Sequence, residues 1–234
     1  MKKLLLLSLL LVSLSSQAFK LMPMSYSISG GGKNNTALFT VQNDSDEPLA
    51  IQLEVRVRDM AVDGKEKHPE TDDFLIFPDQ LILGPKKRRV VKVKWLKGEL
   101  KDTEKAYRLI AEQLPIDVKN NKKKGSDIKI LLRYVAALYV TPKDKLTEIK
   151  VSKAITSKDL RFIHLTLENV GPIHKVLLKP KLVIVQEKKE FPITKLEGIL
   201  GENILAFSKR NFHLIPPESV NIQKPYVVKY INAQ

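Results

Sequence analysis

Apolar and polar residues alternate along most of this chain, in short stretches that turn residues separate. Residues 49–60 show the pattern most clearly. Their apolar members would share one face of a strand: Ile51, Leu53, Val55 and Val57. A period of two residues is typical of a strand with one buried face, and no stretch sustains the 3.6-residue period of a helix for a dozen residues. The pattern therefore predicts an all-β protein.

Two series of strand-like stretches follow one another. Those of the first series cover residues 36–43, 49–60, 72–85, 86–95, 105–116 and 126–142. Residues 105–114 also fit a short helix, but their neighbours favour a strand. The second series begins after a break at residues 141–145. Because short strands spaced every 8–12 residues or so are typical of antiparallel sandwiches, we predict two β-sandwich domains, at 19–142 and 145–234.

The stretch SDIKILLRYVAALYVTP, residues 126–142, predicts a long strand with one apolar face. That face carries Ile128, Ile130, Leu132 and Tyr134. Two uses of it remain open at this point. It can pack into the protein's own core, which is the common cause of such alternation, or it can be buried in another protein.

Residues 1–18 have the composition of a secretory signal. Two lysines precede an apolar run at 4–14, and the small residues at 16–18 suit a signal peptidase. The run is too short to span about 30 Å of hydrocarbon comfortably, and no later stretch reaches about 18 apolar residues. We expect cleavage near Phe19, export, and no membrane insertion of the mature chain.

Charge and cysteine content narrow the classes of partner and site. The formal net charge is +14, and loss of Lys2 and Lys3 would leave 38 basic against 26 acidic residues, or +12. Such a balance favours acidic partners, and export argues against nucleic acid. The chain has no cysteine, which excludes disulfides, thiol catalysis and cysteine-based zinc sites.

Several motifs, in order, resemble a known family. In the first half they are FTVQN, EPLAIQLEV, DFLIFPDQLILGP, RRVVKVKW, AYRLIAEQLP and LRYVAALYVTP. Together they resemble the N-terminal domain of the PapD-like periplasmic pilus-assembly chaperones, while LTLENVGPIHKVLLKPKLVI and GILGENILAF resemble the C-terminal domain. The stretch LLRYVAALYVTP is closer to the branch that serves archaic or spore-coat-like pili, although Ala137 stands where that branch has its first proline.

The resemblance implies a fold and a function. The fold is two immunoglobulin-like sandwiches in an L-shaped arrangement. The function is that of a periplasmic chaperone, which lends the last strand of its first domain to a pilin-like subunit that lacks a strand and delivers that subunit to an outer-membrane usher. No catalysis and no cofactor are implied. The residues that would fill the subunit's groove are Ile128, Ile130, Leu132 and Tyr134.

The resemblance also implies a basic pair that anchors the subunit's terminal carboxylate, and here the chain departs from the family. The two positions fall near Ser25 and Ala137, neither of which is basic. Because a buried carboxylate favours a bidentate, charged donor, the cations that can substitute are Arg133, Lys92 and Arg108. Of these we favour Arg133.

Other readings of the chain are weaker. The four histidines lie in no recognised metal spacing, so no metal site is predicted, although His164 and His174 flank a predicted hairpin and can approach one another. The lysines within residues 119–125 are expected to form a solvated loop tip. The main alternative function is a structural or adhesive envelope protein that keeps residues 128–134 buried. An enzyme has no support beyond scattered carboxylates.

Overall fold

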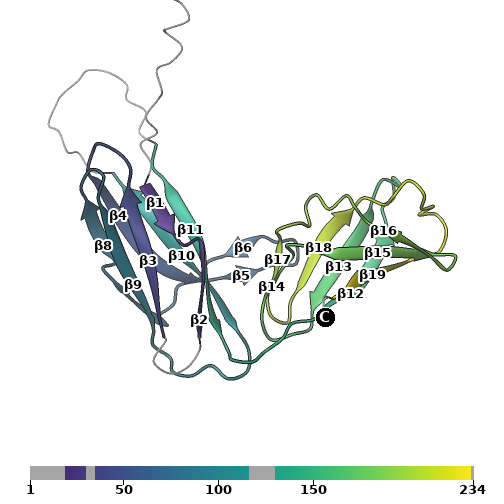
Figure 1. Ribbon diagram of the computed structural model, residues 1–234, viewed down its shortest axis with the longest axis horizontal. Helices are drawn as coiled ribbons and strands as arrows, with labels where there is room; N and C mark the ends of the chain where they lie inside the picture. Colours follow the sequence, from purple (N-terminus) through teal and green to yellow (C-terminus); the bar gives the residue numbers. More distant parts are fainter. Residues whose placement is uncertain (1–18, 30–34, 116–129, 233–234) are drawn as a thin grey trace, which may run out of the picture.

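The computed structural model describes residues 19–29, 35–115 and 130–232. Throughout these ranges the regular structure is strand, with no helix (Figure 1). The predicted all-β fold is confirmed, and the ambiguous residues 105–114 form strand β10. The described part of the chain has no helix of the length and hydropathy that crossing a bilayer requires. The proposed signal at 1–18 and the basic segment 119–125 lie outside the described residues.

Two sheets form the first sandwich. The first has the order β1 (Phe19–Met22), β3 (Thr36–Asn43), β9 (Arg88–Trp95) and β7 (Phe74–Phe77). The second has the order β2 (Ser25–Ser29), β11 (Arg133–Thr141), β10 (Lys105–Leu114), β4 (Leu49–Val57) and β8 (Gln80–Leu83). The chain crosses from the first sheet to the second between β1 and β2, within three residues of sequence.

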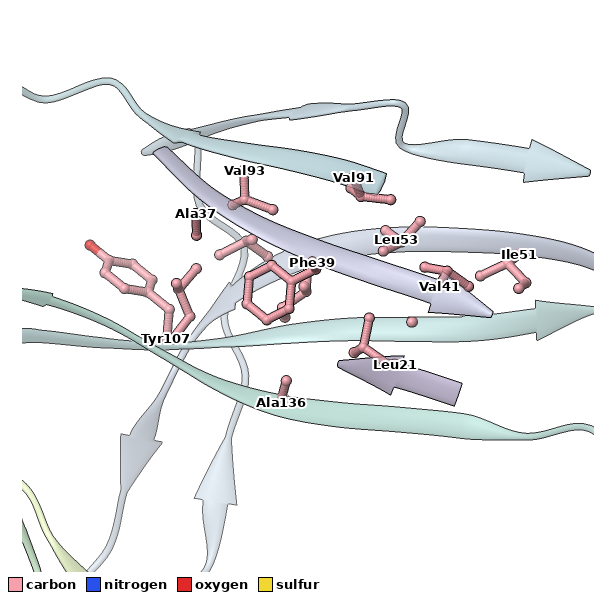
Figure 2. Packing of buried hydrophobic residues seen from close by; sticks show 14 of the residues in the cluster. Leu21, Ala37, Phe39, Val41, Ile51, Leu53, Val91, Val93, Tyr107 and Ala136 are labelled. Carbon is pink, nitrogen blue, oxygen red and sulfur yellow. The ribbon is translucent and has the colours of Figure 1, made fainter. Parts of the chain in front are cut away.

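The core of the first sandwich lies between these sheets (Figure 2). The alternation read from the sequence decides which residues enter it: the apolar members of β4 named above point inward, as do Phe39 on β3 and Tyr107 on β10. Phe74, Trp95 and Tyr107 meet edge to face or tilted, with ring centroids 4.8–6.0 Å apart. Each large apolar side chain buried here contributes about 1.5–3 kcal/mol.

A second core belongs to the C-terminal sandwich. One sheet has the order β12 (Ile149–Thr156), β13 (Ile163–Asn169) and β18 (Lys209–Leu214). Another has the order β16 (Lys189–Pro192), β15 (Lys181–Gln186) and β19 (Val227–Ile231). The short strands β14 (Lys175–Val176) and β17 (Asn203–Ile204) pair with each other. The buried side chains of these strands form a cluster separate from that of the first sandwich.

A buried asparagine ends a core strand in each sandwich. Asn43 donates from Nδ2 to three backbone carbonyls and accepts from the Ser45 backbone N–H and hydroxyl. Asn169 likewise donates to three carbonyls and accepts from the Gly171 backbone N–H and the Thr147 hydroxyl. One side chain therefore satisfies backbone groups that the turn would otherwise leave unpaired, which is the reason asparagine is needed at both turns.

The two sandwiches meet at an angle, and a hairpin of the first sandwich spans the space between them (Figure 1). This hairpin consists of β5 (Asp59–Met60) and β6 (Glu66–Lys67). Its tip accepts a hydrogen bond at the Val62 carbonyl from the Asn211 backbone N–H, at 2.8 Å. Arg210 Nη1 lies 2.9 Å from Met60 Sδ. The hairpin is therefore a strut that links the sandwiches at a second place besides the chain connection.

Candidate functional site

Within the described residues, one edge of β11 is open along its first half. On one side β11 pairs with β10 over its length, while on the other side β2 pairs only with residues Ala137–Thr141. The Ala137 backbone N–H bonds to the Met24 carbonyl on the β2 side, and the Leu132 carbonyl accepts from Gln113 on the β10 side. Because the direction alternates along an antiparallel ladder, the N–H and C=O groups of Arg133 and Val135 point to the open side.

The crossing of the chain between sheets explains this open edge. β1 pairs with β3 in the opposite sheet, so only after the chain has crossed can β2 cover β11. Among the described residues, no strand pairs with the outer edge of β11 before Ala137. Such an edge is a template for pairing with another chain.

The predicted apolar face divides between two environments. Ile130 is 76% exposed, whereas Leu132 and Tyr134 are half-buried against the first core. The Tyr134 ring meets Phe19 edge to face, with centroids 4.8 Å apart. Ile128 lies outside the described residues. The stretch therefore packs partly into the protein's own core and leaves Ile130 exposed, and the role of these four residues in binding a subunit stays a prediction.

The strand itself is shorter than the alternation predicts. It begins at Arg133, and residues 130–132 precede it without regular strand pairing apart from the bond to the Leu132 carbonyl. From Ala136 onward, the inward side chains of β11 are fully buried: Ala136, Leu138 and Val140. The side chains of this stretch are thus buried in the core from Ala136 onward, half-buried at Leu132 and Tyr134, and exposed at Ile130.

The outer face of the second sheet carries a row of residues beside this edge. Ser25 on β2, Ala137 on β11, Arg108 on β10 and Arg56 on β4 are successive partners in register. The two family anchor positions, Ser25 and Ala137, are therefore direct neighbours. This face looks toward the C-terminal sandwich, because Tyr139 on the same face stacks on the His174 ring, with centroids 3.7 Å apart.

The three predicted anchor cations occupy different places. Arg108 lies next to Ala137 in this row, and its side chain is 17% exposed. Arg133 lies on the same face near the open edge, is exposed, and has Glu112 4.0 Å away. Lys92 lies on the outer face of the other sheet, opposite Leu38 and Phe77. The structure thus brings Arg108 and Arg133, but not Lys92, to the face that looks toward the second sandwich.

Arg108 is held by a carboxylate of its own chain. Its Nε and Nη2 atoms donate to both Glu66 oxygens at 2.8 and 2.6 Å. Arg58 binds the same carboxylate at 2.8–2.9 Å, and His68 Nε2 lies 3.1 Å from it. Burial raises the Glu66 pKa, but the hydrogen bonds from Arg108 and His68 and the charges of both arginines outweigh burial and lower it from 4.5 to about 2.

A buried tyrosine connects this cluster to the second sandwich. The Tyr139 hydroxyl accepts from Arg58 Nη1 and from Asn203 Nδ2, each at 2.7 Å. Burial raises the pKa of Tyr139, so the hydroxyl stays neutral. Glu104 adds a second link, because its carboxylate binds both His174 and the Thr141 hydroxyl.

The sequence interpretation missed Glu66, Arg58 and Tyr139 as members of this site. The alternation in LEVRVRDM does put Arg56 and Arg58 on one polar face, which is the available signal for the arginines. Glu66 gave none, because it approaches Arg108 across 42 positions of sequence.

A second surface lies on the outer face of the first sheet. Outward residues of its strands include four cations, Lys20, Arg88, Lys92 and Lys94, and five exposed apolar residues, Met22, Leu38, Leu75, Phe77 and Val90. Among the described residues of these strands, none that faces outward is acidic. The face is therefore both cationic and apolar.

The comparison with protein families identifies the chain. The family model described as pili and flagellar-assembly chaperone, PapD N-terminal domain, matches residues 27–145, half of the chain. The chain belongs to this family. The family resemblance drawn from the sequence motifs is thereby confirmed, and the match includes β11 with its open edge. No curated protein matches the chain in sequence.

Solved structures of low sequence identity share the fold of this family member. The class 5 fimbriae chaperone CfaA has 13% identity and a TM-score of 0.58, with 93% of this chain and 100% of that chain covered. A match to the CsuC–CsuE chaperone–tip adhesion subunit complex of archaic Csu pili from Acinetobacter baumannii has 13% identity and a TM-score of 0.55. It covers 83% of this chain and 89% of that chain. A match to the complex of the SafB chaperone with the SafA pilin from Salmonella enterica has 17% identity and a TM-score of 0.54. It covers 86% of this chain and 85% of that chain.

Proposed function

We propose that this protein is a periplasmic chaperone that binds pilin-like subunits by donor-strand complementation and delivers them to an outer-membrane usher. The observation that carries the proposal is the open edge of β11 within the part of the chain that the family model matches. Two of the similar folds come from chaperones solved with a tip adhesion subunit or a pilin. This function needs neither catalysis nor a cofactor.

The chemistry of the edge suits a subunit that lacks a strand. Such a subunit exposes unpaired backbone groups and an apolar groove. The outward N–H and C=O groups of Arg133 and Val135 would pair with that edge. Ile130 would enter the groove, and burying it contributes about 1.5–3 kcal/mol. Leu132 and Tyr134 would extend the contact from the half-buried part of the same face. The exposure of Ile130 favours this function over a sandwich protein that keeps the stretch for itself.

Arg108 is the best-placed candidate for anchoring a subunit carboxylate, although the sequence alone favoured Arg133. It adjoins Ala137, which in turn adjoins Ser25, and a guanidinium binds a carboxylate in bidentate fashion. A subunit carboxylate at this place would compete with Glu66 for the guanidinium. Arg133, on the same face nearer the open edge, would guide the subunit chain toward it.

Delivery to an usher needs a second surface that stays free while β11 is occupied. The cationic and apolar outer face of the first sheet meets this requirement, because it lies on the far side of the core from β11. Cations interspersed with exposed Phe77 and Leu75 favour an acidic protein surface. The composition of residues 1–18 supports export to the periplasm with removal of this segment.

The test replaces the exposed apolar residue in front of β11. Ile130→Asp should reduce the amount of subunit recovered with the chaperone from periplasm by about tenfold or more, because a charge would enter the apolar groove. Leu178→Asp is the matched control, since Leu178 is 69% exposed on the other sandwich. Mass spectrometry of the co-purified proteins measures the effect. Equal recovery with Ile130→Asp and with Leu178→Asp would overturn the proposal.

A further inference from the structure

Two histidines lie opposite each other on the C-terminal sandwich. His164 on β13 and His213 on β18 are partners in register, and their ring centroids are 5.2 Å apart. Both are exposed, on the face of this sheet that points away from the core, because their neighbours Ile163, Leu165, Phe212 and Leu214 point inward. The sequence suggested an approach of His164 to His174, but His174 instead stacks on Tyr139 in the first sandwich.

The imidazole nitrogens of this pair are free within the described part of the chain. Neither ring has a hydrogen bond or an ion pair there. The next outward row consists of Thr166 and Asn211, which bond to each other at 2.7 Å. On the opposite side of β13, in the neighbouring strand β12, the partner of His164 is Ile155. The Phe162 ring contacts both imidazoles, with centroids 5.0 and 4.6 Å away.

We propose that His164 and His213 together bind one divalent transition-metal ion, Cu²⁺ in preference to Zn²⁺. Imidazole is a ligand that both ions favour, and nitrogen sites generally bind Cu²⁺ more tightly than Zn²⁺. Metal–nitrogen bonds of about 2.0–2.1 Å need one nitrogen from each ring close together, and the two exposed rings have centroids only 5.2 Å apart. The sheet holds the two backbones in register, so little ordering is left for the ion to impose.

The remaining coordination positions belong to water. Among the described residues, no group of three or more histidine, aspartate or glutamate side chains is placed to hold a metal ion. A two-histidine site keeps open positions, which a carboxylate or imidazole from another molecule can fill. The site is distant in sequence and in fold from β11, so it is independent of the proposed subunit binding.

The experiment titrates the purified mature chain, free of any histidine tag, with CuSO₄ and separately with ZnCl₂ by calorimetry. We expect one saturable Cu²⁺ site per chain, tighter than the Zn²⁺ site. His164→Ala and His213→Ala should each weaken Cu²⁺ binding by about tenfold or more. His68→Gln is the control, because His68 binds Glu66 in the other sandwich, and it should leave binding unchanged.

A second measurement separates ligation from aromatic packing. Electron paramagnetic resonance of the Cu²⁺-loaded chain should report two nitrogen ligands in the parent and one in each single variant. Phe162→Ala should retain both nitrogen ligands, since the phenyl ring contributes none. Absence of saturable Cu²⁺ binding, or binding that the two histidine variants leave intact, would overturn the proposal.

Discussion

Glu66 on β6 binds three basic side chains of the first sandwich. Arg58, Arg108 and His68 all bind it, and its side chain is 16% exposed. A buried carboxylate is stable as an anion only when such partners replace its lost hydration. Removing its charge leaves two arginine side chains without a counterion in a poorly hydrated place, which costs more than the loss of a surface ion pair.

Glu66→Gln should therefore lower the free energy of unfolding by about 3 kcal/mol at pH 7. The Glu66 pKa is depressed to about 2 in the folded chain, from 4.5. Its contribution is fully present above pH 4.5 and is lost as pH falls from 4.5 toward 2, so the parent and the variant should converge there. Urea unfolding at a series of pH values measures the difference.

Glu70→Gln provides the matched control for this prediction. Glu70 also binds an arginine, Arg56, at 2.9 Å, but its side chain is 87% exposed. An exposed pair contributes about 0–1 kcal/mol. A Glu66→Gln variant as stable at pH 7 as Glu70→Gln would contradict the view that Glu66 stabilises the fold by neutralising Arg58 and Arg108.

At the scale of elements, the β5–β6 hairpin sets the relation between the sandwiches. Gly64 in its turn has φ of +87°, and an added Cβ would clash with the guanidinium group of Arg210. The positive φ favours glycine there, and a side chain at this position would force the Arg210 guanidinium to move. Arg210 in turn binds Glu202 and the Asn203 carbonyl of the second sandwich.

Gly64→Ala should displace Arg210 and loosen the strut. Gly98→Ala is the control, because Gly98 has a similar φ of +78° but no atom within 4 Å of its added Cβ. Both variants should lose about 1 kcal/mol through backbone strain, whereas only Gly64→Ala should broaden the distribution of domain angles. Small-angle X-ray scattering measures this distribution. Identical scattering from the two variants would contradict the view that the hairpin restricts the angle between the sandwiches.

The sequence predicted elements well and edges poorly. Alternation located β4 and β9, because the period of two residues follows directly from strand geometry. For β10 only the neighbouring stretches favoured a strand over a short helix. Of the four residues of the predicted apolar face, only Tyr134 lies within β11. Alternation did not predict that β11 begins at Arg133, since that depends on where β1 leaves for the other sheet. Nor did it predict the partner of Arg108, because Glu66 reaches Arg108 only through the folded hairpin.

At the scale of the whole molecule, the two proposed binding surfaces lie on opposite sides of the first core. The open edge of β11 belongs to one sheet, and the cationic, apolar face belongs to the other. A subunit on β11 would therefore leave the other face accessible, so that binding and delivery need not compete. The net charge of +14 favours acidic partners in general, whereas in the proposed function the backbone edge selects proteins that lack a strand.

Hydrogen exchange at single amides tests the central claim most directly. In the free protein, the N–H groups of Tyr134 and Ala136 bond to β10 and should exchange slowly, while those of Arg133 and Val135 face the open edge and should exchange fast. In the complex with the subunit that co-purifies from periplasm, Arg133 and Val135 should become protected to the level of their neighbours. Fast exchange at Arg133 and Val135 in that complex would contradict donation of this edge.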